Sequence, residues 1–399
     1  MTASPRINRV LQVHTRYRQA GGEDQVVEAE RALLEGAGVS VEQLLFDNAD
    51  LAEARSLAGD VRLAAGAVWS RSAERKVRAA VISLQPDVVH VHNTFAAASP
   101  AVFRGVGDRP VVQTLHNYRW VCPVAITFRD GNPCTDCVGR AVALPAIVHA
   151  CVRGSRIQSA VATATIAVHR AAGTLRRIDE LVALTSFQRQ VMIDGGLPAG
   201  RIRVVPNFHE PDPGIGDDPR AGVLYIGRLA VEKGIAPLLQ AGAMEPGTVR
   251  IAGSGPLRSA VEASADAGHI VDLGSISSAA VLDEMRRSIA VVIPSIWFEG
   301  FPLVLLQAYA TGTPVIASRI GSLAELVEDG VTGLLARADD PADLAGRIRW
   351  AVDHPAEMAT LGLAARDRYL QRYRGANHLE ALLDLYSSLT ARRAATAHA

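Results

Sequence analysis

Short apolar runs alternate with longer amphipathic stretches along the whole chain. In the first half the runs are RVLQVHT, DVVHVHN, PVVQTLHN, ELVALTS and RIRVVPN, and in the second half they are GVLYIGR, VRIAGSG, HIVDLGS, AVVIPS, TPVIAS and TGLLA. They are continuous in Val, Ile and Leu, which is typical of strands covered on both faces in a parallel sheet. The pattern predicts an α/β fold made of successive βαβ units.

The chain divides at residues 207–221, where Pro, Gly and Asp accumulate and the apolar period disappears. A length of 399 residues exceeds one ordinary hydrophobic core. We therefore predict an N-terminal domain over 1–206, a linker over 207–221 and a C-terminal domain over 222–375. Residues 376–399 are predicted to form a C-terminal helix that packs back on the N-terminal domain, with an Ala/Arg tail that frays after Leu389.

Overall charge excludes one class of partner. Lys and Arg total 41 and Asp and Glu total 41, so no global field favours nucleic acid. The opening MTASPRINRVLQVHT lacks a signal-peptide pattern, and the longest apolar stretches are interrupted before the roughly 20 residues that span a bilayer. We expect a cytoplasmic protein without a nucleic-acid partner.

Charged residues follow two predicted strands of the C-terminal half. Ligands of open α/β sheets bind beyond the carboxyl ends of the strands. There, YIGRLAVEKG carries Arg228 and Lys233, and two such cations can hold a diphosphate. SIWFEGFPLVLLQAYATGTPVIAS carries Glu299 in a turn before a helix, where it can accept hydrogen bonds from sugar hydroxyls. The alternatives are a solvated basic pair and a carboxylate that only complements the helix dipole.

A third segment, IAGSGPL, places Gly253, Gly255 and Pro256 after a strand. Glycine permits close approach of the backbone to a ligand. The spacing is not that of a dinucleotide fingerprint, so the segment does not favour NAD.

These three segments together resemble the donor-binding domain of glycosyltransferase family 4. Members of that family share the GT-B architecture, in which two Rossmann-like domains with parallel sheets face each other across a cleft. The family's diphosphate-binding turn, Gly-Arg-Leu…Lys-Gly, is matched residue for residue by Gly227, Arg228, Leu229, Lys233 and Gly234. The resemblance extends the donor-binding set to Gly253, Gly255, Pro256, Ile276, Gly300, Phe301 and Pro302.

The family also carries two Glu residues eight positions apart, the first on the transferred sugar and the second on the ribose. Glu299 matches the first, but Gln307 stands at the second. A Gln hydrogen bond lacks the charge that roughly doubles the strength of a carboxylate bond. The substitution therefore bears on donor affinity and nucleotide preference.

The first half resembles the same family at further positions. In HTRYRQAGGEDQVVEAERALLEGAG, the resemblance places Gly21 and Gly22 beside the donor phosphates and the acceptor, and an ordinary turn at a helix start is the alternative. In TLHNYRW it places His116 near the transferred sugar, although a lone His is often structural. Ser186 and Asn207 occupy polar positions of the passage into the linker, for which we expect structural roles, with contacts in the cleft as the alternative.

Four cysteines fall close together in the order C-x11-C-x2-C-x13-C: Cys122, Cys134, Cys137 and Cys151. Four thiolates with one two-residue spacing favour a tetrahedral structural zinc site, which would pin an insertion over residues 118–153 and do no chemistry. An iron–sulfur cluster and four reduced, partly buried thiols are the alternatives.

Beyond the cysteines, an Ala/Val/Ile-rich stretch over 157–172 is accompanied by arginines: Arg153, Arg156, Arg170, Arg176 and Arg177. Contact with anionic lipid headgroups, as a lipid-linked acceptor would require, is one interpretation. A core helix with a solvated basic face is the other.

The resemblance implies a retaining glycosyltransferase that moves a sugar from a nucleotide-diphosphate sugar to a hydroxyl acceptor. No carboxylate pair of the kind used by retaining glycosidases is identifiable. By family analogy the leaving diphosphate takes the acceptor's proton, while Arg228, Lys233 and the helix after Glu299 stabilise its charge. We expect no cofactor in the chemistry, and a sugar, a lipid-linked molecule or a small molecule as acceptor. An epimerase or hydrolase of the same fold, and a non-catalytic nucleotide-sugar-binding protein, are the alternatives.

Overall fold

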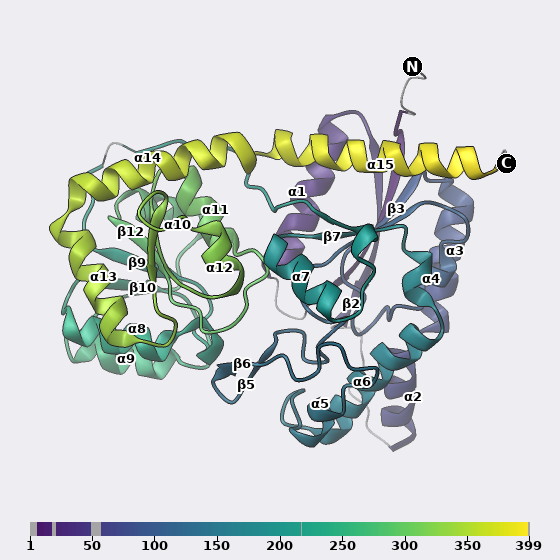
Figure 1. The fold of residues 1–399 in the computed structure, drawn as a ribbon, viewed down its shortest axis with the longest axis horizontal. Coiled ribbons are helices and arrows are strands. Elements are labelled where there is room, and N and C mark those ends of the chain that lie inside the picture. The colour runs from purple at the N-terminus through teal and green to yellow at the C-terminus, as the bar shows by residue number, and fades with distance from the viewer. Residues whose placement is uncertain (1–5, 18–20, 49–56, 217, 398–399) are drawn as a thin grey trace. The chain divides into compact units, whose positions relative to one another are not determined.

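The computed structural model describes residues 6–17, 21–48, 57–216 and 218–397. The chain forms two compact units (Figure 1). The first consists of Met1–Thr127, Thr135–Pro206 and His378–Ala399, and the second of Phe128–Cys134 and Asn207–Asn377. Stretch 207–221, expected as a linker, belongs to the second unit, as does the short piece Phe128–Cys134 of the predicted insertion.

The first unit contains a parallel sheet of six strands in the order β2-β1-β3-β4-β7-β8. The pairing of β1 with β2 is continuous from Arg9 opposite Ser40 to Arg16 opposite Asp47. The strands are β1 (Arg9–Arg16), β2 (Ser40–Asp47), β3 (Val88–Val91), β4 (Val111–Thr114), β7 (Glu180–Ala183) and β8 (Ile202–Val204). Because β3, β4 and β7 are buried throughout, their continuous apolar sequences are those of central strands.

Helices connect these strands. They are α1 (Gly22–Gly36), α2 (Leu57–Val68), α3 (Arg71–Leu84), α4 (Val102–Gly105), α5 (Leu144–Val148), α6 (Arg156–Ala171) and α7 (Ser186–Asp194). Two short strands, β5 (Phe128–Arg129) and β6 (Asn132–Pro133), form a separate antiparallel hairpin. Helix α1 begins where Asp24 Oδ2 accepts a hydrogen bond from the Gly21 backbone N–H at 2.9 Å.

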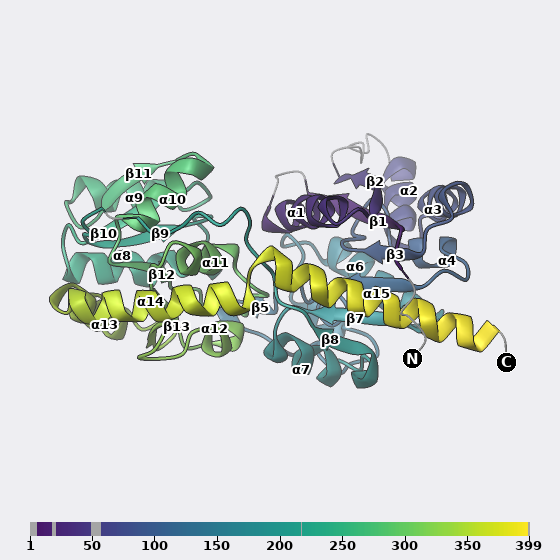
Figure 2. The ribbon, with the colours of Figure 1, turned by 90° about the horizontal axis from the view of Figure 1, so that it is seen from above.

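The C-terminal helix α15 (Gly375–Ala397) packs on the sheet of the first unit (Figure 2). Its Leu382, Tyr386 and Leu389 are buried in one core with Val10 and Val88. Helix α15 extends to Ala397, eight residues past Leu389, after which the sequence predicts fraying. Two arginines of its last turns form ion pairs at the start of β7. Arg392 Nη2 lies 3.1 Å from Glu180 Oε2, and Arg393 Nη2 lies 2.8 Å from Asp179 Oδ2.

The second unit contains a parallel sheet in the order β11-β10-β9-β12-β13-β14. Its strands are β9 (Val223–Ile226), β10 (Val249–Ala252), β11 (Val271–Gly274), β12 (Ala290–Ile293), β13 (Val315–Ser318) and β14 (Gly333–Ala336). Numbered along the unit, this order is 3-2-1-4-5-6, that of a doubly wound Rossmann fold. The strand order reverses between β9 and β12, and such a switch point is where these folds bind ligands.

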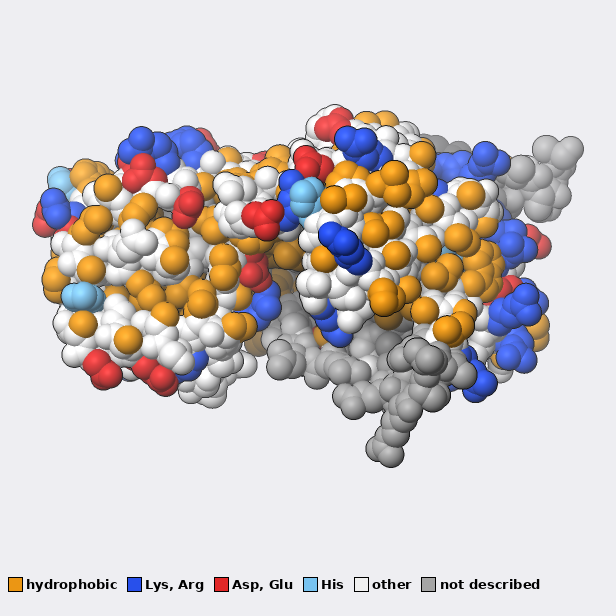
Figure 3. Space-filling model, turned by 90° about the horizontal axis from the view of Figure 1, so that it is seen from below, with side chains coloured by type: hydrophobic (Ala, Val, Ile, Leu, Met, Phe, Trp, Pro, Cys, Tyr) orange, Lys and Arg blue, Asp and Glu red, His pale blue; other side chains and the backbone are white. Residues whose placement is uncertain are grey.

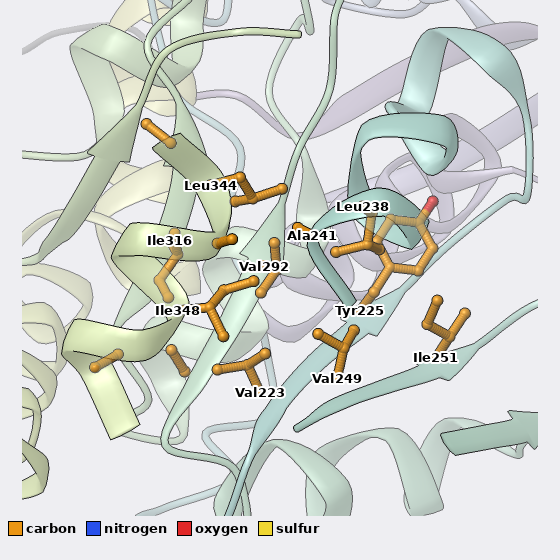
Figure 4. Packing of buried hydrophobic residues seen from close by; sticks show 14 of the residues in the cluster. Val223, Tyr225, Leu238, Ala241, Val249, Ile251, Val292, Ile316, Leu344 and Ile348 are labelled. Carbon is orange, nitrogen blue, oxygen red and sulfur yellow. The ribbon is translucent and has the colours of Figure 1, made fainter. Parts of the chain in front are cut away.

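The helices of the second unit are α8 (Ile235–Met244), α9 (Arg258–Asp266), α10 (Ser278–Arg286), α11 (Leu303–Ala310), α12 (Gly321–Leu326), α13 (Pro341–Asp353) and α14 (Pro355–Arg372). Val223, Val249 and Val292 of the sheet pack with Leu238 of α8 and Ile348 of α13 in one apolar cluster (Figure 4). This packing holds the strands in place, and with them the loops that follow their carboxyl ends. The predicted α/β fold with two parallel-sheet domains is therefore confirmed.

Candidate active site

The loops that follow β9 and β12 carry three predicted site residues of the second unit. Strand β9 leads into Arg228 and Lys233, and β12 leads into the turn with Glu299. The two strands are neighbours, with Val291 paired to Leu224, so both loops emerge at the same edge of the sheet. The switch point of the Rossmann order thus coincides with the charged residues.

Lys233 and Glu299 form an ion pair at this edge. Lys233 Nζ lies 2.8 Å from Glu299 Oε1, and the Ser295 hydroxyl donates to the same oxygen at 2.6 Å. The Glu299 side chain is 6% exposed, whereas that of Lys233 is 24% exposed. Lys233 Nζ also lies 5.0 Å from the centre of the Trp297 ring. These contacts orient the ammonium group while leaving part of it open to a ligand.

Arg228 is held by a neighbour of its own. Its guanidinium pairs with Glu232, and the Arg228 side chain is 57% exposed while that of Glu232 is 13% exposed. The Glu232 carbonyl accepts a hydrogen bond from Ile296 N at 3.0 Å, which ties the two loops together. Tyr225 donates to the Arg228 carbonyl at 2.8 Å. Burial, followed by the charges of Glu299 and Glu232, raises the pKa of Tyr225, so its hydroxyl stays a donor.

Two glycines are required by the packing of these loops. Gly234 has a φ of 71°, and a Cβ there would lie 1.8 Å from the Pro294 carbonyl oxygen. A Cβ at Gly253 would lie 1.9 Å from the Gly227 carbonyl oxygen. Leu229 N also donates to Ser254 O at 2.8 Å. Gly253 thus allows the loop after β10 to approach the loop after β9. From the sequence we expected this glycine to admit a ligand, and not a neighbouring loop.

The remaining predicted donor residues of the second unit lie in loops that follow strands of the same sheet. Ile276 follows β11 and is half-buried, and Pro302 stands at the N-cap of α11, in which Gln307 is half-buried. Gly300 precedes Phe301, whose ring meets that of Tyr373 edge-on with centres 5.5 Å apart. Gly255 and Pro256 lead into α9. Asn207 is buried, its Nδ2 lies 3.4 Å from the Phe301 carbonyl, and its Oδ1 has no hydrogen-bond partner among the described residues.

His116 of the first unit lies two residues beyond β4. Its Nε2 is 3.0 Å from Nδ1 of His92, which follows β3. Burial above all, and then the neighbouring His92 and His14, hold the pKa of His116 well below its usual value. His116 is therefore neutral near pH 7 and can both donate and accept a hydrogen bond. Both histidines line a pocket together with Asn93, Asn117 and Arg119.

A buried carboxylate lies behind these histidines. Glu30 of α1 is 1% exposed, and its carboxylate lies 2.9 Å from His90 Nδ1, 3.4 Å from His92 Nε2 and 3.3 Å from His378 Nε2. Gln12 Nε2 donates to it at 3.0 Å. Burial alone would raise the pKa of Glu30, but the nearby histidines outweigh burial and hold it well below the usual value. Glu30 is therefore ionised.

The same cluster is the one potential metal-binding group of three or more side chains in the described part of the chain. It comprises Glu30, His90 and His92. Tyr386 OH lies 2.7 Å from His90 Nδ1 and Glu30 Oε1 lies 2.9 Å from the same nitrogen, whereas His92 Nε2 is buried without a hydrogen-bond partner among the described residues. This arrangement is that of a polar network joining α1, β3 and α15.

Near the predicted Gly-rich opening, His14 Nε2 lies 2.8 Å from Asp24 Oδ1. Gly21 precedes α1 and Gly22 is its first residue, while residues 18–20 of the predicted segment lie outside the described residues. At Ser186, the cap of α7 is the preceding Thr185, whose hydroxyl accepts from Gln188 N at 3.1 Å.

The structure does not bring the four cysteines into one metal-binding group within the described residues. Cys122 is buried, and Cys134, Cys137 and Cys151 are partly exposed. Burial raises the pKa of Cys122, which disfavours its thiolate. The zinc site stays a prediction.

Two family models cover most of the chain. One, described as glycosyl transferases group 1, matches residues 212–368, and the other, described as glycosyltransferase family 4, matches residues 20–212. The chain belongs to the group 1, family 4 glycosyltransferases. The predicted family is thus confirmed, and the two matches correspond closely to the second and first units.

Relatives of this glycosyltransferase family member include the glycogen synthase of Mycobacterium tuberculosis, 29% identical over 297 residues. That match covers 72% of this chain and 65% of the mycobacterial protein, so it spans less than two thirds of that relative. Among solved structures, sucrose-phosphate synthase of Thermosynechococcus elongatus has a TM-score of 0.68 at 20% identity, covering 96% of this chain and 100% of that one. HepE of Anabaena in complex with UDP and glucose has a TM-score of 0.65 at 18% identity, covering 96% and 100%.

Sequence reasoning on this family member missed several partners of the predicted residues. Ser295 and Trp297 contact the ion pair of Lys233 and Glu299, and Glu232 pairs with Arg228. All of them lie within the motif segments, so their proximity in sequence was a usable signal. Glu30 had no such signal, because its partner His378 is 348 positions away in the chain.

Proposed function

We propose that this protein is a retaining glycosyltransferase that moves a sugar from a nucleotide-diphosphate sugar to a hydroxyl acceptor in polysaccharide or glycoconjugate biosynthesis. The observation that carries the proposal is the position of Lys233, Glu299 and Arg228 at the switch point of the second unit. Cations there suit a diphosphate, and an oriented carboxylate suits sugar hydroxyls. The family and the UDP and glucose bound to HepE support a nucleotide sugar as donor.

In this proposal the diphosphate is both leaving group and proton acceptor. When the bond to the sugar breaks, negative charge develops on the phosphate, and Arg228 and Lys233 stabilise it together with the N-terminus of α11. These groups are already oriented by Glu232 and Glu299, so little reorganisation is needed as charge develops. We propose that no metal ion takes part in this step, and that activity survives EDTA.

Neutral His116 has the protonation state needed to contact the transferred sugar. Because its pKa is lowered, one ring nitrogen remains an acceptor for a sugar hydroxyl near pH 7. The acceptor is a sugar, a lipid-linked molecule or a small molecule in this proposal. We also propose that the protein acts in the cytoplasm.

The experiment is a transfer assay with purified protein. A panel of nucleotide sugars is first screened by thermal shift, since a specific ligand stabilises the folded state. The stabilising donor is then incubated with candidate acceptors, and the product's anomeric configuration is determined by NMR. A glycosylated acceptor with the donor's configuration is expected. An inverted product, or an epimerised or hydrolysed donor with every acceptor, would refute the proposal.

Substitutions assign the roles. Lys233→Ala should lower kcat/KM by about 100- to 1000-fold, the loss typical of removing one donor that stabilises transition-state charge. Glu299→Ala should also lower turnover, by misplacing the sugar. Arg349→Ala is the control, because the Arg349 side chain on α13 is 62% exposed and pairs with Glu245, the residue that follows α8. Unchanged turnover in Lys233→Ala would remove that residue from the site.

A non-catalytic nucleotide-sugar-binding protein is the second candidate, and Gln307 in place of the family's second Glu favours it. Calorimetry distinguishes the two. Donor binding without transfer to any acceptor and without hydrolysis would support the binding protein.

We further propose that the four cysteines hold a structural zinc ion. Tetrahedral zinc binds four thiolates, and the pair Cys134 and Cys137 has the usual spacing of one arm. Native mass spectrometry of the full chain should show one zinc ion per molecule, lost in the double variant Cys134→Ser and Cys137→Ser. A fully active protein that carries no metal would contradict this.

A further inference from the structure

Exposed apolar side chains lie close to arginines on one surface of the first unit. Figure 1 places α5 and α6 at the lower side of this unit, and Figure 3, seen from that side, shows hydrophobic side chains gathered there with Lys and Arg among them. We call this the α5–α6 surface. Its exposed members are Arg140, Val142, Leu144, Val148, Arg153, Arg156, Ile157 and Val168.

The apolar members are strongly exposed. Ile157 is 77% exposed, Val148 63% and Leu144 59%. Scattered single apolar residues are normal on a surface, whereas contiguous ones mark a site of interaction. Five of the exposed large apolar side chains of the first unit belong to the segment 142–168, so this surface is a candidate for contact with a partner.

Helix α6 carries exposed apolar side chains on its outer face, opposite the face that packs on the rest of the first unit. Its inner face buries Ala162 and Ile166, while Ile157 and Val168 are on the outer face. No charged residue lies between Arg156 and His169. The arginines of this region stand at the ends of α6 or beyond them, and not along its outer face. Because the buried face already packs on the rest of the first unit, the apolar side chains of the outer face are available to a partner.

The segment that forms the α5–α6 surface is basic, although the exposed Asp136 directly precedes it. Residues 137–178 contain six arginines and no Asp or Glu, although Lys and Arg equal Asp and Glu over the whole chain, at 41 each. Arg140, Arg153 and Arg156 are exposed beside the apolar side chains. A basic rim around an apolar centre is complementary to anionic headgroups over hydrocarbon.

Hydrogen bonds hold the surface in place. The Ser155 hydroxyl accepts from Gln158 N at 3.3 Å and caps α6, and Val152 N donates to the Ser159 hydroxyl at 2.9 Å. Thr163 Oγ1 lies 3.4 Å from the Ala143 carbonyl, which joins α6 to the start of α5. The exposed side chains are thus presented by an ordered segment, and little conformational entropy is lost on docking.

We propose that the α5–α6 surface docks on an anionic lipid bilayer. Leu144, Val148 and Ile157 enter the headgroup boundary, and the exposed arginines contact lipid phosphates. The contact is peripheral, since none of the described helices is both long enough and apolar enough to cross a bilayer. A second copy of the chain is a poorer fit, because a two-fold interface would bring the same arginines close to one another. The proposal is independent of the proposed enzymatic function.

The test is flotation of the full chain with vesicles and no sugar nucleotide. Vesicles of phosphatidylcholine with phosphatidylserine should carry the protein upward, and vesicles of phosphatidylcholine alone should not. Leu144→Ser with Ile157→Ser should weaken binding by about tenfold or more, because their apolar area no longer enters the boundary. Arg153→Gln with Arg156→Gln should weaken it by about fivefold for each arginine lost. High salt should release the protein.

The controls change similar residues outside the surface. They are the variants Ile82→Ser and Arg75→Glu. Both residues are on α3, where the Ile82 side chain is 65% exposed and Arg75 is exposed. Both should bind anionic vesicles as the unchanged protein does. The proposal is overturned if the protein stays in solution with anionic vesicles, or if both double variants bind like the controls. It is also overturned if the double variants abolish self-association instead of vesicle binding.

Discussion

Glu23 shows how a single residue is tuned by its surroundings. Its Oε1 is buried and makes no hydrogen bond to the described residues. Burial raises its pKa to about 8, a hydrogen bond from Tyr17 and the charge of Arg119 oppose this, and the charge of Asp24 adds to it. The carboxyl is thus mostly protonated at neutral pH, in contrast to the ionised Glu30 on the same helix.

This difference predicts a pH dependence. Between pH 4.5 and about 8 the folded protein holds a proton on Glu23 that the unfolded chain releases. The free energy of unfolding therefore falls as pH rises through this interval. Glu23→Gln should remove that loss, so its Tm should increase relative to that of the unchanged protein as pH rises toward 8. A Tm difference that is constant with pH, measured by scanning calorimetry, would contradict the assignment.

Glu30 illustrates what the sequence could not reveal at this scale. Nδ1 of His378 lies 3.0 Å from Pro206 O, and its Nε2 lies 3.3 Å from the Glu30 carboxylate. Glu30→Ala would remove the buried acceptor that Gln12 and the histidines share. We expect the free energy of unfolding to fall by about 2 kcal/mol or more in chemical denaturation, because each buried polar group left without a partner costs about 1–3 kcal/mol. A loss below about 0.5 kcal/mol would contradict the role of Glu30 as the shared acceptor.

At the scale of elements, the strands could be predicted and the contacts between their loops could not. Continuous apolar runs such as AVVI of β12 identify strands covered on both faces. The sequence could not show how far α15 extends, because the Ala and Arg residues after Leu389 carry no apolar period. Its anchors are distant in sequence, with Arg393 and Asp179 being 214 positions apart.

The loop after β10 provides a test of packing between elements. In Gly253→Ala, the new Cβ would meet the Gly227 carbonyl, so the two loops must separate. We expect a loss of about 1–3 kcal/mol in stability together with weaker donor binding. Gly346→Ala on α13 is the matched control, because nothing lies within 4 Å of a Cβ there. Equal stability and equal donor affinity in the two variants would show that the close approach is unimportant.

At the scale of the whole molecule, each of the two units carries some of the predicted site residues. The second unit carries the cations and the carboxylate at its switch point, and the first unit carries the neutral His116 in front of a buried charge network. Both sets stand at strand ends, which is why the sequence could locate them. The order of the strands, and hence the switch point between β9 and β12, required the structure.

The most direct test of the central claim is a crystal structure of the full chain soaked with the nucleotide sugar that stabilises it most. We predict that the diphosphate lies at the edge of β9 and β12, within hydrogen-bonding distance of Lys233 and Arg228. Its binding should turn the Lys233 ammonium from Glu299 toward the phosphate. A diphosphate bound at any other place on the protein, with the ion pair of Lys233 and Glu299 unchanged, would contradict the account.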